Sequence, residues 1–300
     1  MAVEYTLYNY QPSLAAAVIF IVLFGASTIA HVIQLTMKKT WYFIPFVIGG
    51  ICKPSPHPSV PLASTTATNH SLRTVEAVGY VGRAMNATDD KGDWSINAYI
   101  IQSMLILLGP PFFAASIYMI LGRIIRLTNG ESHSVVRAKW ITKIFVLGDV
   151  LSFLTQSGGG GILAKAKSLD EQKTGEHVII VGLIIQVLFF GFFIIASGLF
   201  HYRINAYPTT RSQVINVPWQ RYLYILYFAS ILILWRSIYR LAEYIQGAQG
   251  TLQKHEVYLY VFDATLMFLT CIVFNIFHPS SIISHKSLEE VPQEEMEFRN

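Results

Sequence analysis

Apolar residues gather along this chain in long runs that are separated by short polar segments. A run of about 20 apolar residues is long enough for a helix that crosses a bilayer. Six runs of this length predict six membrane-spanning helices, at 14–35, 98–121, 141–163, 178–200, 222–245 and 257–277. The pattern therefore predicts an all-α, polytopic membrane protein.

A seventh apolar run, 41–51, is too short to cross a membrane alone, because eleven helical residues reach only about 16 Å. Apolar character stops after Ile51 and resumes at Val75. Joining 41–51 to 75–85 gives a complete span. We therefore predict a seven-helix bundle whose second helix is interrupted by an insertion at 52–74.

The insertion 52–74 is rich in Pro, Ser and Thr and has no helical periodicity, which is typical of disorder. Its 23 residues correspond to 69 nucleotides, the size of a short intron, and its ends can be back-translated to splice signals. Two explanations therefore stand, a retained intron and a genuine loop. Sequencing of cDNA across this junction decides between them.

Positive charge predicts the orientation, because cytosolic loops are enriched in Lys and Arg. With seven spans and the N-terminus outside, the inner segments carry eleven Lys and Arg and the outer segments six. The N-terminus is therefore expected outside, and the acidic tail 286–300 in the cytosol. Asn86 begins a glycosylation sequon in a predicted outer loop, in agreement with this topology.

Composition supports the membrane assignment. Hydrophobic residues make up 53% of the chain and charged residues 13%, against about 25% in soluble domains. The net charge is only +4 and the basic residues are scattered, so we expect no nucleic-acid partner. The two cysteines form no disulfide framework or metal motif. We expect no cofactor, no resident metal and no enzymatic activity.

Ionisable and amide side chains within the predicted spans are the candidate functional residues, because such groups at membrane depth need a partner or a wet cavity. Two interpretations are open, a polar cavity toward the outer leaflet and an ion-pair network that only locks the helices together. The candidates for substrate binding or translocation are Glu76, Tyr80, Arg83, Asp149, Gln156, Arg236, Arg240, Glu243 and Asp263.

Two backbone features accompany these residues. Pro110 and Pro111 lie midway along the third span, where the missing amide donors kink a helix. The glycine run 158–161 follows Gln156 and allows either flexing or close helix packing.

Five segments of the chain together form a specific pattern. They are EAVGYVGR from Glu76, PPFFAASIYMILGRII from Pro110, GDVLSFLTQSGGGG from Gly148, RSIYRLAEYIQGAQGTLQKHEVYLYVFDATLMF from Arg236 and FHPS from Phe277. At these segments the chain resembles the fungal lipid-translocating exporter family, which is named for aminocholesterol resistance. The resemblance implies seven membrane passes, an outside N-terminus, and a role in moving sphingoid long-chain bases, in tolerance to toxic amphiphiles or, in one branch, in porphyrin or haem traffic.

The implied substrates carry a cationic amine, and the predicted spans hold four acids against three arginines. We therefore predict that Asp263 or Glu76 faces the amine, while Arg236 and Arg240 pair with Glu243 and the remaining acid. The leading hypothesis is a translocator of amphiphilic lipids at the plasma membrane. The expected partners are membrane lipids or amphiphilic small molecules, and no protein partner is predicted.

Two other classes of function remain as alternatives. A seven-pass receptor or stress sensor fits the same topology. The other is an intramembrane hydrolase. Three histidines near predicted cytosolic span ends, His31, His201 and His278, could in principle hold zinc, but no second histidine or carboxylate accompanies them at ligand spacing.

Overall fold

The computed structural model describes residues 12–37, 80, 83–84, 96–166, 168–215, 217–247 and 250–277. Every regular element in these ranges is helical, so the all-α prediction is confirmed for them. The long helices are α1 (Leu14–Met37), α4 (Ile96–Leu127), α5 (Ala138–Lys165), α6 (Leu169–Ala206) and α8 (Trp219–Gln246). The shorter elements are η2 (Glu131–His133), α7 (Thr210–Val214), α9 (Thr251–Lys254), α10 (Glu256–Leu259), η3 (Tyr260–Ala264) and α11 (Thr265–Ile276).

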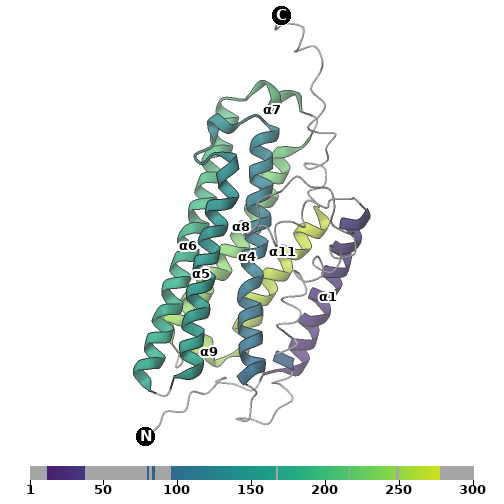
Figure 1. Ribbon diagram of the computed structural model, residues 1–300. Coiled ribbons are helices and arrows are strands. Elements are labelled where there is room, and N and C mark those ends of the chain that lie inside the picture. Colours follow the sequence, from purple (N-terminus) through teal and green to yellow (C-terminus); the bar gives the residue numbers. More distant parts are fainter. Residues whose placement is uncertain are drawn as a thin grey trace, which may run out of the picture.

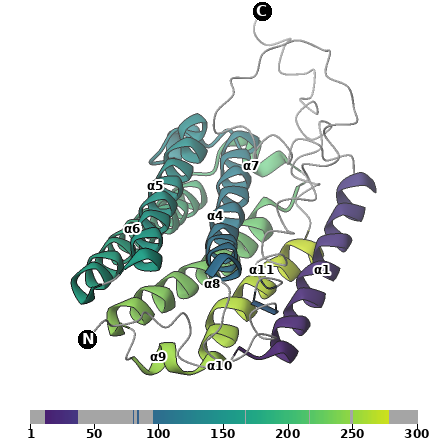
Figure 2. The same cartoon turned by 60° about the horizontal axis from the view of Figure 1, so that its bottom comes forward.

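The long helices form a bundle in which α4, α5 and α6 stand side by side (Figure 1). Helix α8 packs against both α4 and α6, and α11 lies between α8 and α1. The view from the end of the bundle shows α5 and α6 on one side and α1 with α11 on the other (Figure 2). Helices α4 and α8 therefore join the two halves.

Side-chain burial is that of a protein in a bilayer. Large apolar side chains on the outer faces stay exposed, as at Leu188 (65%) and Ile195 (61%). Charged side chains lie inside, as at Arg236 (1%) and Asp149 (3%). Lipid accounts for this arrangement, since an apolar outer face is stable there and a buried charge is retained for packing or function.

Four of the described stretches are long and apolar enough to cross a membrane: Leu105–Leu127, Leu169–Ala206, Trp219–Gln246 and Glu256–Ile276. They overlap the predicted spans 98–121, 178–200, 222–245 and 257–277, with ends that differ by up to nine residues. In α1 the apolar stretch Leu14–Ala30 is shorter, and α5 is not in this set. Asp149, Gln156 and the glycine run make α5 more polar than its neighbours. The count of seven spans and the orientation of both termini stay predictions.

The glycine run at the end of the predicted fourth span serves packing at one position. A Cβ atom added at Gly159 would lie 2.8 Å from the Gly175 carbonyl oxygen of α6, whereas one at Gly158, Gly160 or Gly161 would meet nothing within 4 Å. Gly159 thus lets α5 and α6 approach closely, which is the common use of glycine between membrane helices.

Several predictions fall outside the described residues. These are the run 41–51, the insertion 52–74, most of 75–85, the sequon at Asn86, the candidate Glu76 and the tail 286–300. From the predicted second span, only Tyr80, Arg83 and Ala84 are described.

Candidate functional site

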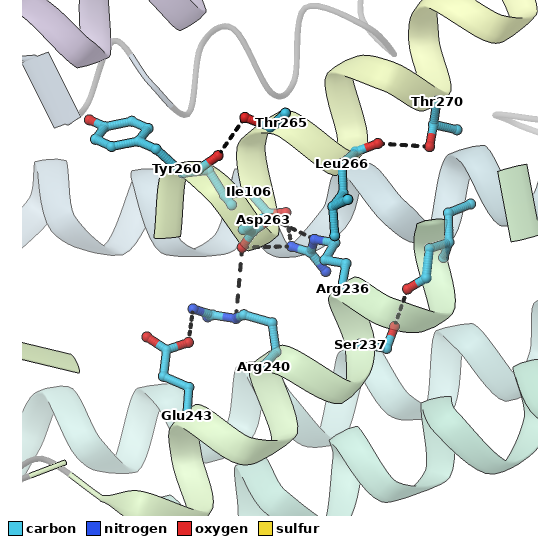
Figure 3. A network of polar contacts seen from close by, with 11 residues as sticks. Ile106, Arg236, Ser237, Arg240, Glu243, Tyr260, Asp263, Thr265, Leu266 and Thr270 are labelled. Atoms are coloured by element: carbon cyan, nitrogen blue, oxygen red, sulfur yellow. Dashed lines mark hydrogen bonds and ion pairs between the residues drawn. The ribbon is translucent and has the colours of Figure 1, made fainter. Parts of the chain in front are cut away.

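The most deeply buried ion pair joins Arg236 of α8 to Asp263 of η3. The Arg236 Nε atom donates to Asp263 Oδ1 at 2.5 Å, and Nη2 lies 3.3 Å from Oδ2. Both side chains are almost inaccessible, at 1% and 2% exposure. A two-point Arg–carboxylate contact fixes the relative orientation of its partners. This pair therefore locks α8 to η3 (Figure 3).

Arg236 has a third contact, which the proline pair explains. In a regular helix the N–H group of residue 110 would donate to the carbonyl of Ile106, but Pro110 has no N–H group. Arg236 Nη2 donates to that carbonyl instead, at 3.2 Å. Pro110 thus provides a free acceptor on α4, and the guanidinium holds α4, α8 and η3 together.

Asp263 lies in a π-helical segment, η3, between α10 and α11. The wider turn is visible at Tyr260, whose carbonyl accepts the backbone N–H of Thr265, five residues later. The Thr265 hydroxyl donates to the same carbonyl at 2.8 Å. Single π-helical turns occur frequently at functional sites, and this one sets the position of the Asp263 carboxylate.

Arg240 and Glu243 complete a charge cluster with Arg236 and Asp263, which Figure 3 shows from close by. Arg240 Nη1 donates to Glu243 Oε2 at 2.7 Å. Its Nε atom is buried, has no hydrogen-bond partner, and is 4.0 Å from Asp263 Oδ2. Of the pairings that the sequence left open, the structure has Arg236 with Asp263 and Arg240 with Glu243. The cluster therefore alternates in charge, in the order Glu243, Arg240, Asp263, Arg236. Its longest contact is the one between Arg240 and Asp263.

A second network connects Arg83 to Glu256, which lies just before the predicted span 257–277 and was not among the predicted site residues. Arg83 Nη2 donates to Glu256 Oε1 at 2.8 Å, and Arg83 Nε donates to the Tyr260 hydroxyl at 3.0 Å. The same carboxylate accepts the backbone N–H of Ser13, at 3.0 Å. Tyr80 stacks on Phe24 nearby, with ring centroids 5.8 Å apart. Arg83 thus ties its segment to α1 and α10.

Gln156 belongs to the interface between α5 and α6. Its Nε2 atom donates to Ser152 Oγ at 2.6 Å and to Gln186 Oε1 at 3.1 Å. Ser152 in turn donates to the Gly182 carbonyl at 2.7 Å. These bonds join two neighbouring helices, and they give Gln156 a structural role beside its predicted one. Gln186 was not selected from the sequence, because a single amide is a weak signal within an apolar run.

Asp149 differs from the other buried acids. It lies in α5 and interacts with the Tyr118 hydroxyl of α4. The two groups do not form a hydrogen bond, since Asp149 Oδ2 and Tyr118 Oη both lack a hydrogen-bond partner. In the described part of the chain no arginine or lysine pairs with Asp149, whereas Asp263, Glu243 and Glu256 each contact an arginine.

Within the described ranges, no group of three or more His, Cys, Asp or Glu side chains is placed to hold a metal ion. Among the described residues, the polar interior instead consists of ion pairs between and within helices, the hydrogen bonds of Gln156, and the Asp149 carboxyl group, which has no cation. This arrangement can lock helices, exchange ion-pair partners, or accept a charged headgroup or a proton.

Comparisons with known proteins agree with the membrane character of the chain. The family model "RTA1 like protein" matches residues 73–286, a range that begins near the end of 52–74. Protein RTA1 of Saccharomyces cerevisiae is 38% identical over 282 residues, which cover 92% of this chain and 85% of that protein. Protoporphyrin uptake protein 1 of the same yeast is 36% identical over 284 residues, or 91% of each chain.

A more distant relative is the sphingoid long-chain base transporter RSB1 of S. cerevisiae strain Lalvin EC1118. It is 26% identical over 308 aligned residues, which cover 92% of this chain and 74% of the transporter. No solved structure gives a significant match. The apolar helices and these relatives describe a multi-pass membrane protein, and the chain belongs to the RTA1-like protein family.

Proposed function

We propose that this protein translocates amphiphilic lipids across the plasma membrane, with sphingoid long-chain bases as the substrate class. Relatives named for transport of a long-chain base and for uptake of a porphyrin support movement of amphiphiles. The apolar helices support a path within the bilayer. The proposed topology is that expected from the sequence, seven spans with the N-terminus outside.

The charge cluster carries this proposal. A long-chain base presents an ammonium group and hydroxyl groups at one end of an apolar chain. Glu243 and Asp263 can accept from the ammonium, and the unpartnered Arg240 Nε can donate to a hydroxyl. Arg240 and Asp263 are 4.0 Å apart, so their contact is looser than the Arg236–Asp263 pair and is the place where a headgroup can enter.

Release of a labelled sphingoid base from yeast tests the proposal. Cells would express a form lacking 52–74, the 300-residue form, or an empty vector. We expect faster release with the shortened form. Glu243→Gln in that background should slow release, whereas Ile238→Val, a conservative change at a side chain that is 47% exposed on the same helix, should not. Surface-localised protein that leaves release unchanged would count against the long-chain base.

A porphyrin is the second candidate, because the relative named for protoporphyrin uptake is 36% identical, above the 26% of the long-chain base transporter. Porphyrin carboxylates are anions and would need Arg240, whereas an ammonium would need Glu243. Arg240→Gln should therefore reduce porphyrin uptake more than Glu243→Gln does. If instead Glu243→Gln reduces release of the long-chain base more than Arg240→Gln does, the substrate is the cationic base.

A further inference from the structure

Asp149 and Tyr118 form a buried polar contact that the proposed headgroup site does not use. Asp149 is 3% exposed and Tyr118 is fully buried. The two side chains come from different helices, α5 and α4, and are close enough to interact electrostatically. Each has an oxygen atom without a hydrogen-bond partner. Buried polar atoms usually have a hydrogen-bond partner, so the two oxygens of this pair need an explanation.

The described residues around this contact are aromatic and uncharged. The Tyr118 ring packs on Phe145, Phe190 and Phe193, with centroids 5.3, 6.0 and 4.6 Å away. From α4, the titratable group that faces Asp149 is Tyr118. On α6, Phe189 meets α5 at Gly148, and Gln186 meets it at Gln156. Neither of these two side chains titrates.

An ionised carboxylate in an apolar interior is unfavourable by several kcal/mol unless a cation neutralises it. For Asp263, Glu243 and Glu256 an arginine provides that cation. No described residue provides a cation for Asp149. A bound proton would neutralise its carboxylate and would need no additional volume. An ammonium group with its chain would have to push apart rings whose centroids are only 4.6–6.0 Å apart.

We propose that Asp149 is a proton-binding residue that couples transport to the proton gradient, and that its protonated carboxyl group forms a hydrogen bond with the Tyr118 hydroxyl. A proton from water on one side binds to Oδ2 and forms a neutral carboxylic acid, and the same O–H bond breaks toward water on the other side. The coupling rests on the proposed transport function, whereas the proton binding does not. The sequence has no Walker-type phosphate loop through which ATP would supply the energy.

Infrared difference spectroscopy of the purified full chain, taken across a range of pH, tests proton binding directly. We expect a carbonyl band of a protonated, buried carboxyl group that appears as the pH falls and is absent in Asp149→Asn. Tyr118→Phe should keep the band and shift its frequency, because the carboxyl loses its neighbouring hydroxyl. That variant also assigns the band if Asp149→Asn does not fold.

Ser152→Ala is the matched control, since it removes a buried hydroxyl one turn farther along the same helix and should leave the band in place. A wild-type spectrum in which no band changes with pH would overturn the proposal. The same conclusion would follow if the band persisted in Asp149→Asn.

Transport by the full chain in liposomes tests the coupling. The probe is a labelled sphingosine with a quaternary trimethylammonium group, which cannot itself carry a proton, and protein-free liposomes give the background. We expect wild-type protein to accumulate the probe against its gradient only when a pH gradient is imposed. Asp149→Asn should lose this accumulation and keep downhill movement.

The two measurements separate the two proposals. Transport that ignores the pH gradient would overturn the coupling but leave the translocator function. If the protein moves neither this probe nor the unmodified base, either with or without 52–74, the translocator function fails, and the infrared titration still decides whether Asp149 binds a proton.

Discussion

Asp263 and Asp149 are the same residue type at nearly the same burial, 1% and 3% exposed, yet their surroundings differ. Asp263 accepts two contacts from Arg236 and has Arg240 at 4.0 Å. Asp149 has a tyrosine hydroxyl and no cation among the described residues. Burial of an acid therefore does not identify its role, because the role depends on the group that neutralises its charge.

The backbone differs as well. The cluster around Asp263 needs two departures from regular helix, the π-helical η3 and the missing N–H group of Pro110. Asp149 lies within the continuous helix α5. A paired acid is sensitive to the loss of its cation, whereas an acid without a cation is relieved when its charge is removed.

The largest effect is expected for Arg236→Met. It leaves Asp263 buried without its cation and the Ile106 carbonyl without a donor, and breaking a buried pair from one side destabilises by about 3–5 kcal/mol. Thermal unfolding of the purified protein in detergent should show a large fall in the midpoint.

A double variant, Arg236→Met with Asp263→Leu, should recover most of that loss, because it removes both charges together. If the double variant is as unstable as the single one, shape and packing rather than charge hold this region.

Glu256→Gln should have a smaller effect, about 1–3 kcal/mol, because a partly exposed carboxylate that accepts charged and backbone donors is replaced by an amide. The pair with Arg83 and the bond from Ser13 N–H both weaken, so α1 should become more susceptible to limited proteolysis. Glu131→Gln removes a charge at an exposed position and is the control. Equal proteolysis in both variants would contradict a role for Glu256 in holding α1.

The helices were the part of the fold that the sequence predicted well, because lipid requires long apolar runs. The predicted spans were shorter than the helices wherever a helix continues into polar residues. Helix α6 has 38 residues and starts at Leu169, whereas the apolar run suggested 178–200. Its first turns are polar, with Asp170 and Glu171 in the first turn and the Ser168 hydroxyl capping the Glu171 N–H. Hydropathy alone does not detect such an extension.

The charged candidates were visible because any ionisable residue stands out in an apolar run, but their partners were not. The Arg236–Asp263 pairing depends on a π-helical turn and on the acceptor freed by Pro110, neither of which periodicity predicts. Glu256 was missed because it precedes the predicted last span. Tyr118 was missed because an aromatic ring within a span is indistinguishable from ordinary packing until its hydroxyl is placed beside Asp149.

Pro110→Ala tests the link between the proline and Arg236, with an expected energy of about 1 kcal/mol, that of one hydrogen bond. The new alanine N–H would satisfy the Ile106 carbonyl in the ordinary helical way. Arg236→Met should therefore destabilise the Pro110→Ala protein less than it destabilises the wild type. Pro111→Ala is the control, because its new N–H group would donate to the Leu107 carbonyl and leave the Ile106 carbonyl unchanged. Equal losses in all three backgrounds would mean that the carbonyl contact contributes nothing measurable.

The smallest effect on stability is expected for Asp149→Asn. The amide has the size of the carboxyl group, introduces no charge, and can still contact the Tyr118 hydroxyl, so the unfolding midpoint should stay the same or rise. Asp263→Asn, the same chemical change at the same depth of burial, should lower the midpoint, because it leaves the Arg236 guanidinium without its anion. Unfolding of the two purified variants side by side measures the contrast directly. If Asp149→Asn is as unstable as Asp263→Asn, then Asp149 is a structural acid whose partner lies outside the described residues, and the distinction between the two regions disappears.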